Sequence, residues 1–326
     1  MTRIVRLVGS FFLLLPPLLA QGQSSIIADG AKVEKLAGGY KFTEGPAADK
    51  NCDVYFIDQG LTEKDPHRIL KWSAADYEKL KAANEDISKS ITVWLEPSGR
   101  SNGMCFDNKG NLITCADEKN ELWSIDKDKK VTVLVKEYKG KLLDGPNDVW
   151  VRPDNGMYMT DPYYHRPWWG PEHATPQQDK RAVYFLSPDG KTLTRVIDDY
   201  VMPNGIIGLP DGKTLYVSDI NGRKTWKYDI QEDGSLKNKM LFCNVGSDGM
   251  TVDDQGNVYL TSGAVVICDK TGKQIERITM PAIAPATRGE QPANVCFGGK
   301  DHDTLFITAR TGVYLLKMKT KGVGSQ

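Results

Sequence analysis

Six polar residues open six similar segments of the chain, and their side chains carry oxygen atoms of the kind that hard metal ions bind. They are Glu44, Asn102, Asn147, Asn204, Asp248 and Asn294. Carboxylate and carboxamide oxygens suit Ca²⁺, which takes about 6–8 oxygen ligands at about 2.3–2.6 Å. Zinc prefers cysteine and histidine, and no histidine holds one of these positions. The pattern predicts one divalent metal ion, with Ca²⁺ as the first expectation and Mg²⁺, Mn²⁺ or Zn²⁺ as alternatives.

Each of these residues begins a repeat made of an apolar strand, a Gly- or Asp-rich turn and an aliphatic-aromatic strand. The segment "SNGMCFDNKGNLITCAD" at 101–117 shows the pattern, and "SDGMTVDDQGNVYLTSG" at 247–263 repeats it. Turns such as "DNKGN" and "DDQGN" close tight hairpins. A third strand and a variable fourth follow, so each unit holds about four antiparallel strands in roughly 45–58 residues. Six such units predict an all-β, six-bladed β-propeller with four antiparallel strands per blade.

Equivalent positions of the blades of a propeller meet at one mouth of the central channel. The six opening residues are therefore expected to face a shared axis. At any single position an ordinary turn residue is the competing interpretation, because Asn and Asp before Gly favour turns. Turn chemistry explains Glu44 worst, since Glu is a poor turn residue.

Three further segments carry structural predictions. Residues 73–89, rich in Ala, Lys and Glu, predict a helix inserted in the first blade. The segment "SSIIADGAKVEKLAGGY" at 24–40 is a candidate for the strand that closes the ring. Residues 161–181 form a long Pro-rich loop with aromatic side chains, among them Trp168. Such a loop is either a lid that walls a ligand pocket or a self-packed Ω-loop.

The composition of the chain limits which classes of protein it can belong to. The chain has 326 residues, of which 42 are Lys or Arg and 42 are Asp or Glu. It therefore has no excess of positive charge of the kind that nucleic-acid-binding proteins use. Residues 1–22 read as a signal peptide, which predicts a secreted or periplasmic protein with no membrane attachment after cleavage. An uncleaved N-terminal anchor is the alternative. Residues 23–326 then form one domain, and its six cysteines read mainly as buried thiols, with one disulfide as the alternative.

Four short motifs, one in each of four blades, resemble those of the gluconolactonase / senescence-marker-protein (regucalcin) family, which includes luciferin-regenerating-enzyme-like proteins. They are "TEGP" at 43–46, "PNG" at 203–205, "SDGM" at 247–250 and "CFGGKD" at 296–301. The resemblance implies that Glu44, Asn204 and Asp248 bind a divalent metal and that Asn147 lies beside it. Regucalcin-type members carry Arg two residues before that Asn, where this chain has Gly145. The candidate substrate contacts are Arg100, Asn102, Trp168 and Asn294.

The resemblance also implies a reaction, the metal-dependent hydrolysis of a small sugar lactone such as gluconolactone. The metal would act as a Lewis acid, and Asp248 is the first candidate for the general base. Activation of the water by the metal itself is an alternative of nearly equal standing. Asp161 and Asp219 are reserve candidates for the base. Two other functions stay open: a non-catalytic propeller that binds metal or a small molecule, and a paraoxonase-like esterase or organophosphatase. The oligomeric state stays open too.

Overall fold

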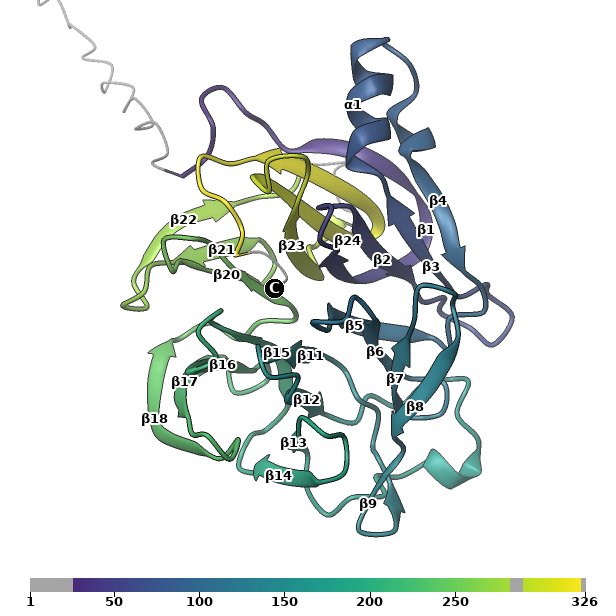
Figure 1. The fold of residues 1–326 in the computed structure, drawn as a ribbon, viewed down its shortest axis with the longest axis vertical. Coiled ribbons are helices and arrows are strands. Elements are labelled where there is room, and N and C mark those ends of the chain that lie inside the picture. The colour runs from purple at the N-terminus through teal and green to yellow at the C-terminus, as the bar shows by residue number, and fades with distance from the viewer. Residues whose placement is uncertain (1–25, 282–289, 324–326) are drawn as a thin grey trace, which may run out of the picture.

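The computed structural model describes residues 26–281 and 290–323, and these residues fold into an all-β, propeller-like structure. Sheets of antiparallel strands are arranged around a common centre (Figure 1). The predicted signal peptide at 1–22 lies outside the described residues. Within the described ranges, no helix is long and apolar enough to cross a lipid bilayer.

Four of the sheets hold four strands each, and each sheet follows chain order. The first is β5 (Ser101–Phe106), β6 (Leu112–Ala116), β7 (Glu121–Ile125) and β8 (Val131–Val135). The second is β11 (Val149–Val151), β12 (Met157–Asp161), β13 (Ala182–Leu186) and β14 (Leu193–Ile197). The third is β15 (Pro203–Gly208), β16 (Thr214–Asp219), β17 (Lys224–Ile230) and β18 (Leu236–Cys243). The fourth is β19 (Met250–Val252), β20 (Val258–Thr261), β21 (Val265–Cys268) and β22 (Gln274–Ile278). A short ribbon of β9 (Glu137–Tyr138) and β10 (Lys141–Leu142) links the first two sheets.

The remaining sheet has six strands in the order β23-β24-β1-β2-β3-β4. Their bounds are β23 (Asn294–Gly298), β24 (Thr304–Lys317), β1 (Glu34–Ala48), β2 (Val54–Asp58), β3 (Arg68–Trp72) and β4 (Ile91–Leu95). The prediction of six separate four-stranded blades is therefore not confirmed for the described residues, because the long strands β1 and β24 join the first and last repeats. The predicted closing strand is confirmed, since Glu34–Gly38 pairs with residues 312–315 of β24.

The predicted insertion in the first repeat lies between β3 and β4, as expected, but its helix is shorter than predicted. Helix α1 spans Ala74–Ala82, and a 3₁₀ turn follows at Ile87–Ser90. Ser73 caps the helix by accepting a hydrogen bond from the Asp76 backbone N–H. Tyr77 anchors the helix on the sheet through an edge contact with the Trp72 ring.

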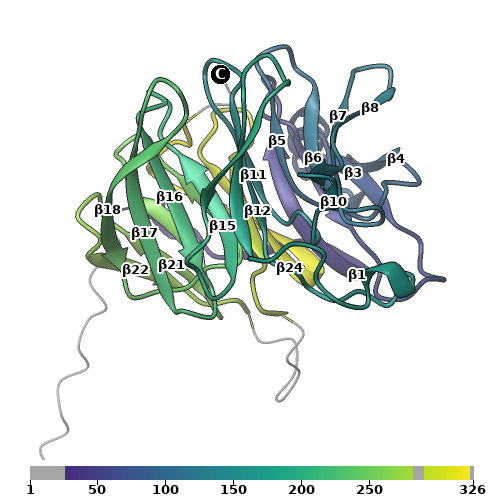
Figure 2. The same cartoon turned by 90° about the horizontal axis from the view of Figure 1, so that it is seen from below.

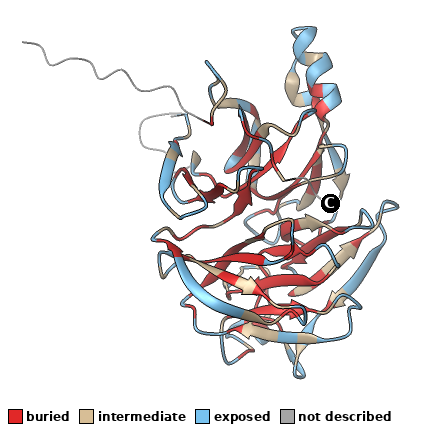
Figure 3. Cartoon of the chain, turned by 60° about the vertical axis from the view of Figure 1, so that its left-hand side comes forward, coloured by how far each residue is buried: buried red, intermediate tan, exposed pale blue. Residues whose placement is uncertain are grey.

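Apolar side chains between neighbouring sheets form the core. Strand β6 is buried along its whole length, whereas the outermost strand β18 is largely exposed. Buried residues gather in the inner parts of the sheets and exposed ones at the periphery (Figure 3). Each fully buried aliphatic side chain contributes about 1.5–3 kcal/mol to stability. Seen from the side, the sheets stand next to one another (Figure 2). All six cysteines are free and four of them are buried, which agrees with their interpretation as thiols in strands.

Candidate functional site

The strand pairing is irregular at several of the openings where the polar side chains lie. The pairing register shifts at three openings, namely Glu44–Ala47, Ser101–Met104 and Pro203–Ile206. A β-bulge inserts an extra residue into one strand and re-aims its side chain. At the first opening, Gly45 has φ +48°, and a Cβ there would lie 1.9 Å from the Asn102 carbonyl oxygen. Glycine therefore follows Glu44 because the next repeat passes too close for any side chain.

Contacts between neighbouring repeats join the six opening segments into a closed ring. Besides the approach of Gly45 to Asn102, three hydrogen bonds join neighbouring openings. The Gly103 N–H donates to the Asn147 carbonyl (2.7 Å), the Ile206 N–H to the Asp148 carboxylate (3.3 Å) and the Asn204 amide to the Asp248 carboxylate (2.9 Å). The Asn294 side chain lies close enough to Glu44 to lower the pKa of that carboxyl. Between Asp248 and Asn294 the ring is closed by Gly249, where a Cβ would meet the Asn294 amide at 1.9 Å. The predicted convergence of the six openings is thus observed, while the role of each side chain stays a prediction.

Two carboxylates of this ring lie close enough to influence each other, the buried Glu44 and the half-buried Asp248. Glu44 is 3% exposed, and burial raises its pKa well above the ordinary value. The charge of Asp248 raises the pKa of Glu44 further, and the Gly45 N–H, 2.8 Å from Oε2, opposes both effects. Burial also raises the pKa of Asp248, against the hydrogen bond from Asn204 and the charges of Arg166 and Arg310. A cation between Glu44 and Asp248 would relieve this unfavourable burial of two acids.

Asn204 supplies the observation that tests whether a metal fits. Its Nδ2 donates to Asp248 Oδ1 and to the Tyr164 hydroxyl, both at 2.9 Å. Its Oδ1 is buried and has no hydrogen-bond partner in the described part of the chain. A buried oxygen without a donor is costly unless something positive binds it. Together with Glu44 and Asp248 it offers hard oxygen ligands, which fit Ca²⁺ or Mg²⁺ and disfavour zinc.

Histidine and cysteine take no part in this site. Among the described residues there is no group of three or more His, Cys, Asp and Glu side chains that could hold a metal ion. The ligand set suggested by the ring is therefore a mixed one of two carboxylates and one carboxamide. Three protein side chains leave coordination positions for water or substrate, because Ca²⁺ takes about 6–8 oxygen ligands.

Asn147 occupies the predicted place, and the residue after it is one that the sequence interpretation missed. Asn147 is 7% exposed and lies in the ring. The Asp148 carboxylate accepts hydrogen bonds from the backbone N–H groups of Val149 (2.9 Å) and Ile206 (3.3 Å). Burial raises the pKa of Asp148 to about 8. The signal was present in the "ND" pair at 147–148, since an acid at the start of a buried strand needs a reason.

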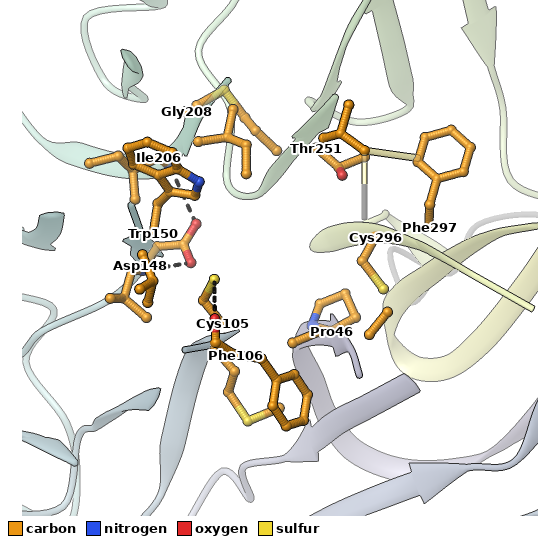
Figure 4. A pocket seen from close by; sticks show the side chains of 18 of the residues that line it. Pro46, Cys105, Phe106, Asp148, Trp150, Ile206, Gly208, Thr251, Cys296 and Phe297 are labelled. Carbon is orange, nitrogen blue, oxygen red and sulfur yellow. Dashed lines mark hydrogen bonds between the residues drawn. The ribbon is translucent and has the colours of Figure 1, made fainter. Parts of the chain in front are cut away.

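The innermost strands enclose a cavity of about 140 Å³ next to this ring. Residues of β1, β5, β11, β15, β19 and β23 line it, so every sheet of more than two strands contributes. Most of the lining is apolar, as Figure 4 shows for Pro46, Phe106 and Phe297. Asp148 points into it from β11's opening, with its two backbone hydrogen bonds drawn in Figure 4. The acidic ring therefore lies against a largely apolar interior, which explains the strong desolvation of its carboxylates.

The long loop at 161–181 has features of both predicted kinds of loop, the lid beside a ligand pocket and the self-packed Ω-loop. Tyr164 reaches the site through its hydroxyl, and burial raises the pKa of Tyr164 to about 12. Arg166 holds the loop on the first four-stranded sheet by donating from Nε to Asp117 Oδ2 at 2.6 Å. The indole N–H of Trp169 donates to the Asp117 carbonyl, also at 2.6 Å. The loop is thus packed by its own side chains and also contributes to the mouth.

Trp168 and Arg100, both predicted to contact substrate, contact each other. The Arg100 guanidinium lies 4.3 Å from the centre of the Trp168 ring. It also donates to the backbone carbonyls of Gln59, Thr62 and Glu63. Arg100 is 2% exposed, so this arrangement supports the wall of the mouth. At Gly145, where the family resemblance leads us to expect Arg, a Cβ would lie 2.9 Å from the Trp169 ring, so the indole already fills that space.

The reserve candidates for a base are engaged in holding loops. Asp219 accepts hydrogen bonds from the backbone N–H groups of Val201, Met202 and Gly222. Asp161 is fully buried and accepts from the Asp144 N–H at 3.0 Å. Each carboxylate lies at the end of the second strand of its repeat. It accepts hydrogen bonds from the backbone just before the opening residue of the same repeat. Their contacts are those of structural anchors, which leaves Asp248 as the first candidate.

Tyr164→Phe tests the contact between the loop and the site. Removal of the hydroxyl takes away a hydrogen-bond partner of the Asn204 amide, so the carboxamide loses part of its orientation. We expect Ca²⁺ affinity to fall about 10-fold, the lower end of the effect seen when a partner of a metal ligand is removed. Isothermal titration with Ca²⁺ measures it. Tyr163→Phe is the matched control, because that hydroxyl bonds only the loop carbonyls of His173 and Ala174. Equal effects of the two changes would contradict a role for Tyr164 in the site.

The chain is similar to known proteins over most of its length. The family described as SMP-30/Gluconolactonase/LRE-like region matches residues 42–311. A gluconolactonase of Zymomonas mobilis is 26% identical over 91% of this chain and 84% of its own. The diisopropyl-fluorophosphatase of Loligo vulgaris is 24% identical over 81% of this chain and 84% of its own.

Solved structures agree with this assignment. The structure of a gluconolactonase from Xanthomonas campestris has a TM-score of 0.73 at 27% identity, covering 90% of this chain and 91% of the other. That of a calcium-binding regucalcin from Agrobacterium tumefaciens shares the fold, with a TM-score of 0.65 at 18% identity over 90% of this chain and 96% of the other. The matched range 42–311 includes all six opening residues from Glu44 to Asn294. The chain belongs to the SMP-30/gluconolactonase/LRE-like family.

Proposed function

We propose that this protein is a metal-dependent lactonase that hydrolyses a sugar lactone, with gluconolactone as the first substrate to test. One observation carries the proposal: the buried Asn204 Oδ1, which has no partner among the described residues, lies in the ring of strand openings together with the buried Glu44 and the half-buried Asp248. Ca²⁺ is the proposed metal, because all these ligands are hard oxygens. Membership of a family that includes gluconolactonases supports the reaction.

The residues of the ring have different proposed roles in metal binding and proton transfer. Glu44, Asn204 and Asp248 would hold the ion, with Asn147 beside it. When bound, Ca²⁺ would supply Lewis-acid stabilisation of the negative charge that develops on the lactone carbonyl oxygen. Asp248 accepts the proton of the attacking water, whose oxygen bonds to the carbonyl carbon. The ring C–O bond then breaks, and the proton passes to the departing alkoxide to give the open hydroxy acid. The Asn204 amide, 2.9 Å from Asp248 Oδ1, orients the carboxylate for this transfer.

We also infer that the six-stranded sheet consists of two blades, which makes six in one domain at 23–326. Residues 304–308 of β24 pair with β23, whereas residues 310–315 pair with β1. Arg310, with φ +50°, marks the change of partner. Both β1 and β23 line the inner cavity, as the first strand of each four-stranded sheet does. The signal peptide at 1–22 belongs to the same proposal and makes the protein secreted or periplasmic.

Two alternatives remain specific enough to test. The similarity to a diisopropyl-fluorophosphatase supports an organophosphatase or paraoxonase-like esterase, which could use the same oxygen ligands. A non-catalytic protein that binds metal or a small molecule could use them too. No catalytic histidine pair supports the paraoxonase-like alternative, because no histidine lies at the six openings.

Metal removal separates these functions. The purified protein is incubated with glucono-1,5-lactone, with and without a chelator, and acid release is followed. A ligand at 100 times its dissociation constant stabilises the folded state by about 2.7 kcal/mol. We therefore expect chelation to abolish turnover and to lower the Tm by about 5 °C. Faster hydrolysis of diisopropyl fluorophosphate than of any lactone would favour the organophosphatase, and a Tm shift without turnover of either would favour the binding protein.

A further inference from the structure

A second cavity, of about 480 Å³, is lined by Asp248 and by residues of the sheets on either side of it. Three arginines from three different sheets line it. Arg223 lies in the turn before β17, Arg277 in β22 and Arg310 in β24. These strands belong to sheets that are neighbours around the centre (Figure 1). Asp248 is the only acidic residue among the described residues that line the cavity.

These three arginines differ from the other arginines of the described chain. The described residues include nine arginines, and six of them donate to a carboxylate or a backbone carbonyl. The six are Arg68, Arg100, Arg152, Arg166, Arg181 and Arg195. Arg223, Arg277 and Arg310 make no side-chain hydrogen bond or ion pair within residues 26–281 and 290–323. All the described arginines that lack such a hydrogen bond or ion pair therefore line one cavity.

An excess of charge does not explain this. Lys and Arg total 42, and Asp and Glu total 42, so acids for pairing are as numerous as bases. The segments outside the described ranges, 1–25, 282–289 and 324–326, contain no Asp or Glu side chain that could pair with these arginines. Exposed guanidinium groups from separate strands cost some mutual repulsion when they face the same space. An anion in that space would remove the repulsion and accept their hydrogen bonds.

The chemistry of the guanidinium group indicates which anion fits. Arginine presents a planar fork of donors that matches the two oxygens of a carboxylate or the oxygens of a phosphate. The cavity is large enough for such a group together with part of a sugar chain. It reaches Asp248, so a molecule whose carbonyl lies at the proposed metal would extend its far end toward the arginines.

We propose that this cavity binds an anionic group of the substrate, so that the preferred lactone carries a carboxylate or a phosphate at the end remote from its carbonyl. The proposal rests on the lactonase function proposed above and adds the substrate class. Arg310 is the contact to test first, because it lines the same cavity as Asp248 and comes from β24, the strand that joins the first and last repeats. Arg223 and Arg277 hold the same group from the neighbouring sheets.

Steady-state kinetics with three lactones test the proposal. They are neutral glucono-1,5-lactone, a glucaric acid lactone with a carboxylate, and 6-phosphoglucono-1,5-lactone. We expect the wild-type protein to have at least about tenfold higher kcat/KM for one of the charged lactones, and the carboxylate and phosphate arms identify which. Arg310→Gln should lower kcat/KM for that lactone about tenfold, and for the neutral lactone less than about twofold. Arg310→Lys should restore part of the loss, since it keeps the charge but not the fork.

Controls keep this test independent of the lactonase proposal. Lys237→Gln removes the same charge from an exposed position on β18 and should change nothing. Glucarate and inorganic phosphate, titrated calorimetrically into the protein, measure anion binding without any turnover. The triple change of Arg223, Arg277 and Arg310 to Gln should abolish that binding while the Tm stays within a few degrees. Binding that survives the triple change, or a preference for the neutral lactone, would overturn the anionic site and leave the lactonase function intact.

Discussion

Replacing Glu44 by Gln or Asp248 by Asn is expected to reduce kcat/KM for lactone hydrolysis by about 10²–10³-fold. Each change keeps the size and hydrogen-bonding shape of the side chain but removes one of the two negative charges that face the proposed metal. The loss corresponds to about 3–4 kcal/mol of transition-state stabilisation, the usual effect of weakening a preorganised charge at a reacting carbonyl. Hydrolysis of glucono-1,5-lactone at saturating Ca²⁺ measures it.

The same variants should be more stable than the wild-type protein when metal is absent. Glu44 is 3% exposed, and both burial and the charge of Asp248 disfavour its ionised form. A neutral amide removes that penalty, so we expect the chelated variants to unfold at a Tm a few degrees above that of the chelated wild type. Added Ca²⁺ should then raise the Tm of the wild type but hardly that of the variants.

Replacement of a functional carboxylate should lower activity but raise the stability of the metal-free protein, and this combination distinguishes it from a structural carboxylate. Asp219→Asn should show the structural pattern, with lower stability, because three backbone N–H groups depend on that side chain. Asp301→Asn is the neutral control, since this exposed acid lies in the "CFGGKD" motif but outside the ring. If Glu44→Gln and Asp248→Asn both keep full metal-dependent activity, the assigned site is wrong.

Repetition made the ring of openings predictable from sequence. Glu44, Asn204 and Asp248 could be placed together because equivalent positions of a repeat face one axis, whatever the details of pairing. The separation into six sheets could not be predicted, because no pattern in the sequence shows that β1 and β24 run on as continuous strands. The shorter helix α1 follows from Asn84 at φ +54°, a left-handed residue that ends it two positions after Ala82.

Contacts made by insertions and by different repeats were beyond the sequence patterns. Tyr164 reaches Asn204 from a loop with no equivalent in the other repeats, so periodicity says nothing about its target. Asp148 was hidden by its neighbour Asn147, which already filled the expected position. Arg223, Arg277 and Arg310 occupy unrelated positions in their repeats, and only the three-dimensional arrangement brings them to one cavity.

Gly45→Ala is expected to destabilise the protein by about 3–5 kcal/mol and to impair the site as well. The residue has φ +48°, and the added methyl group would lie 1.9 Å from the Asn102 carbonyl oxygen, a backbone atom that cannot rotate away. The left-handed conformation costs about 1–2 kcal/mol for alanine, and overpacking adds about 1–3 kcal/mol or more. Relief requires β1 and β5 to separate at their openings, which displaces the neighbouring Glu44. A shift of about 1 Å at a reacting centre can cost about 10²-fold in rate.

Gly39→Ala separates the two causes, because Gly39 lies in the same strand at φ +89° with no atom within 4 Å of its would-be Cβ. It should cost only about 1–2 kcal/mol from backbone conformation and leave activity and Ca²⁺ affinity unchanged. Urea denaturation with and without Ca²⁺ gives the stability difference, and lactone hydrolysis below the Tm gives the effect on the site. If Gly45→Ala costs no more than Gly39→Ala, the close approach of the second repeat does not position Glu44. A larger cost together with a lower Ca²⁺ affinity would establish that the glycine after Glu44 is required by the packing of one repeat against the next.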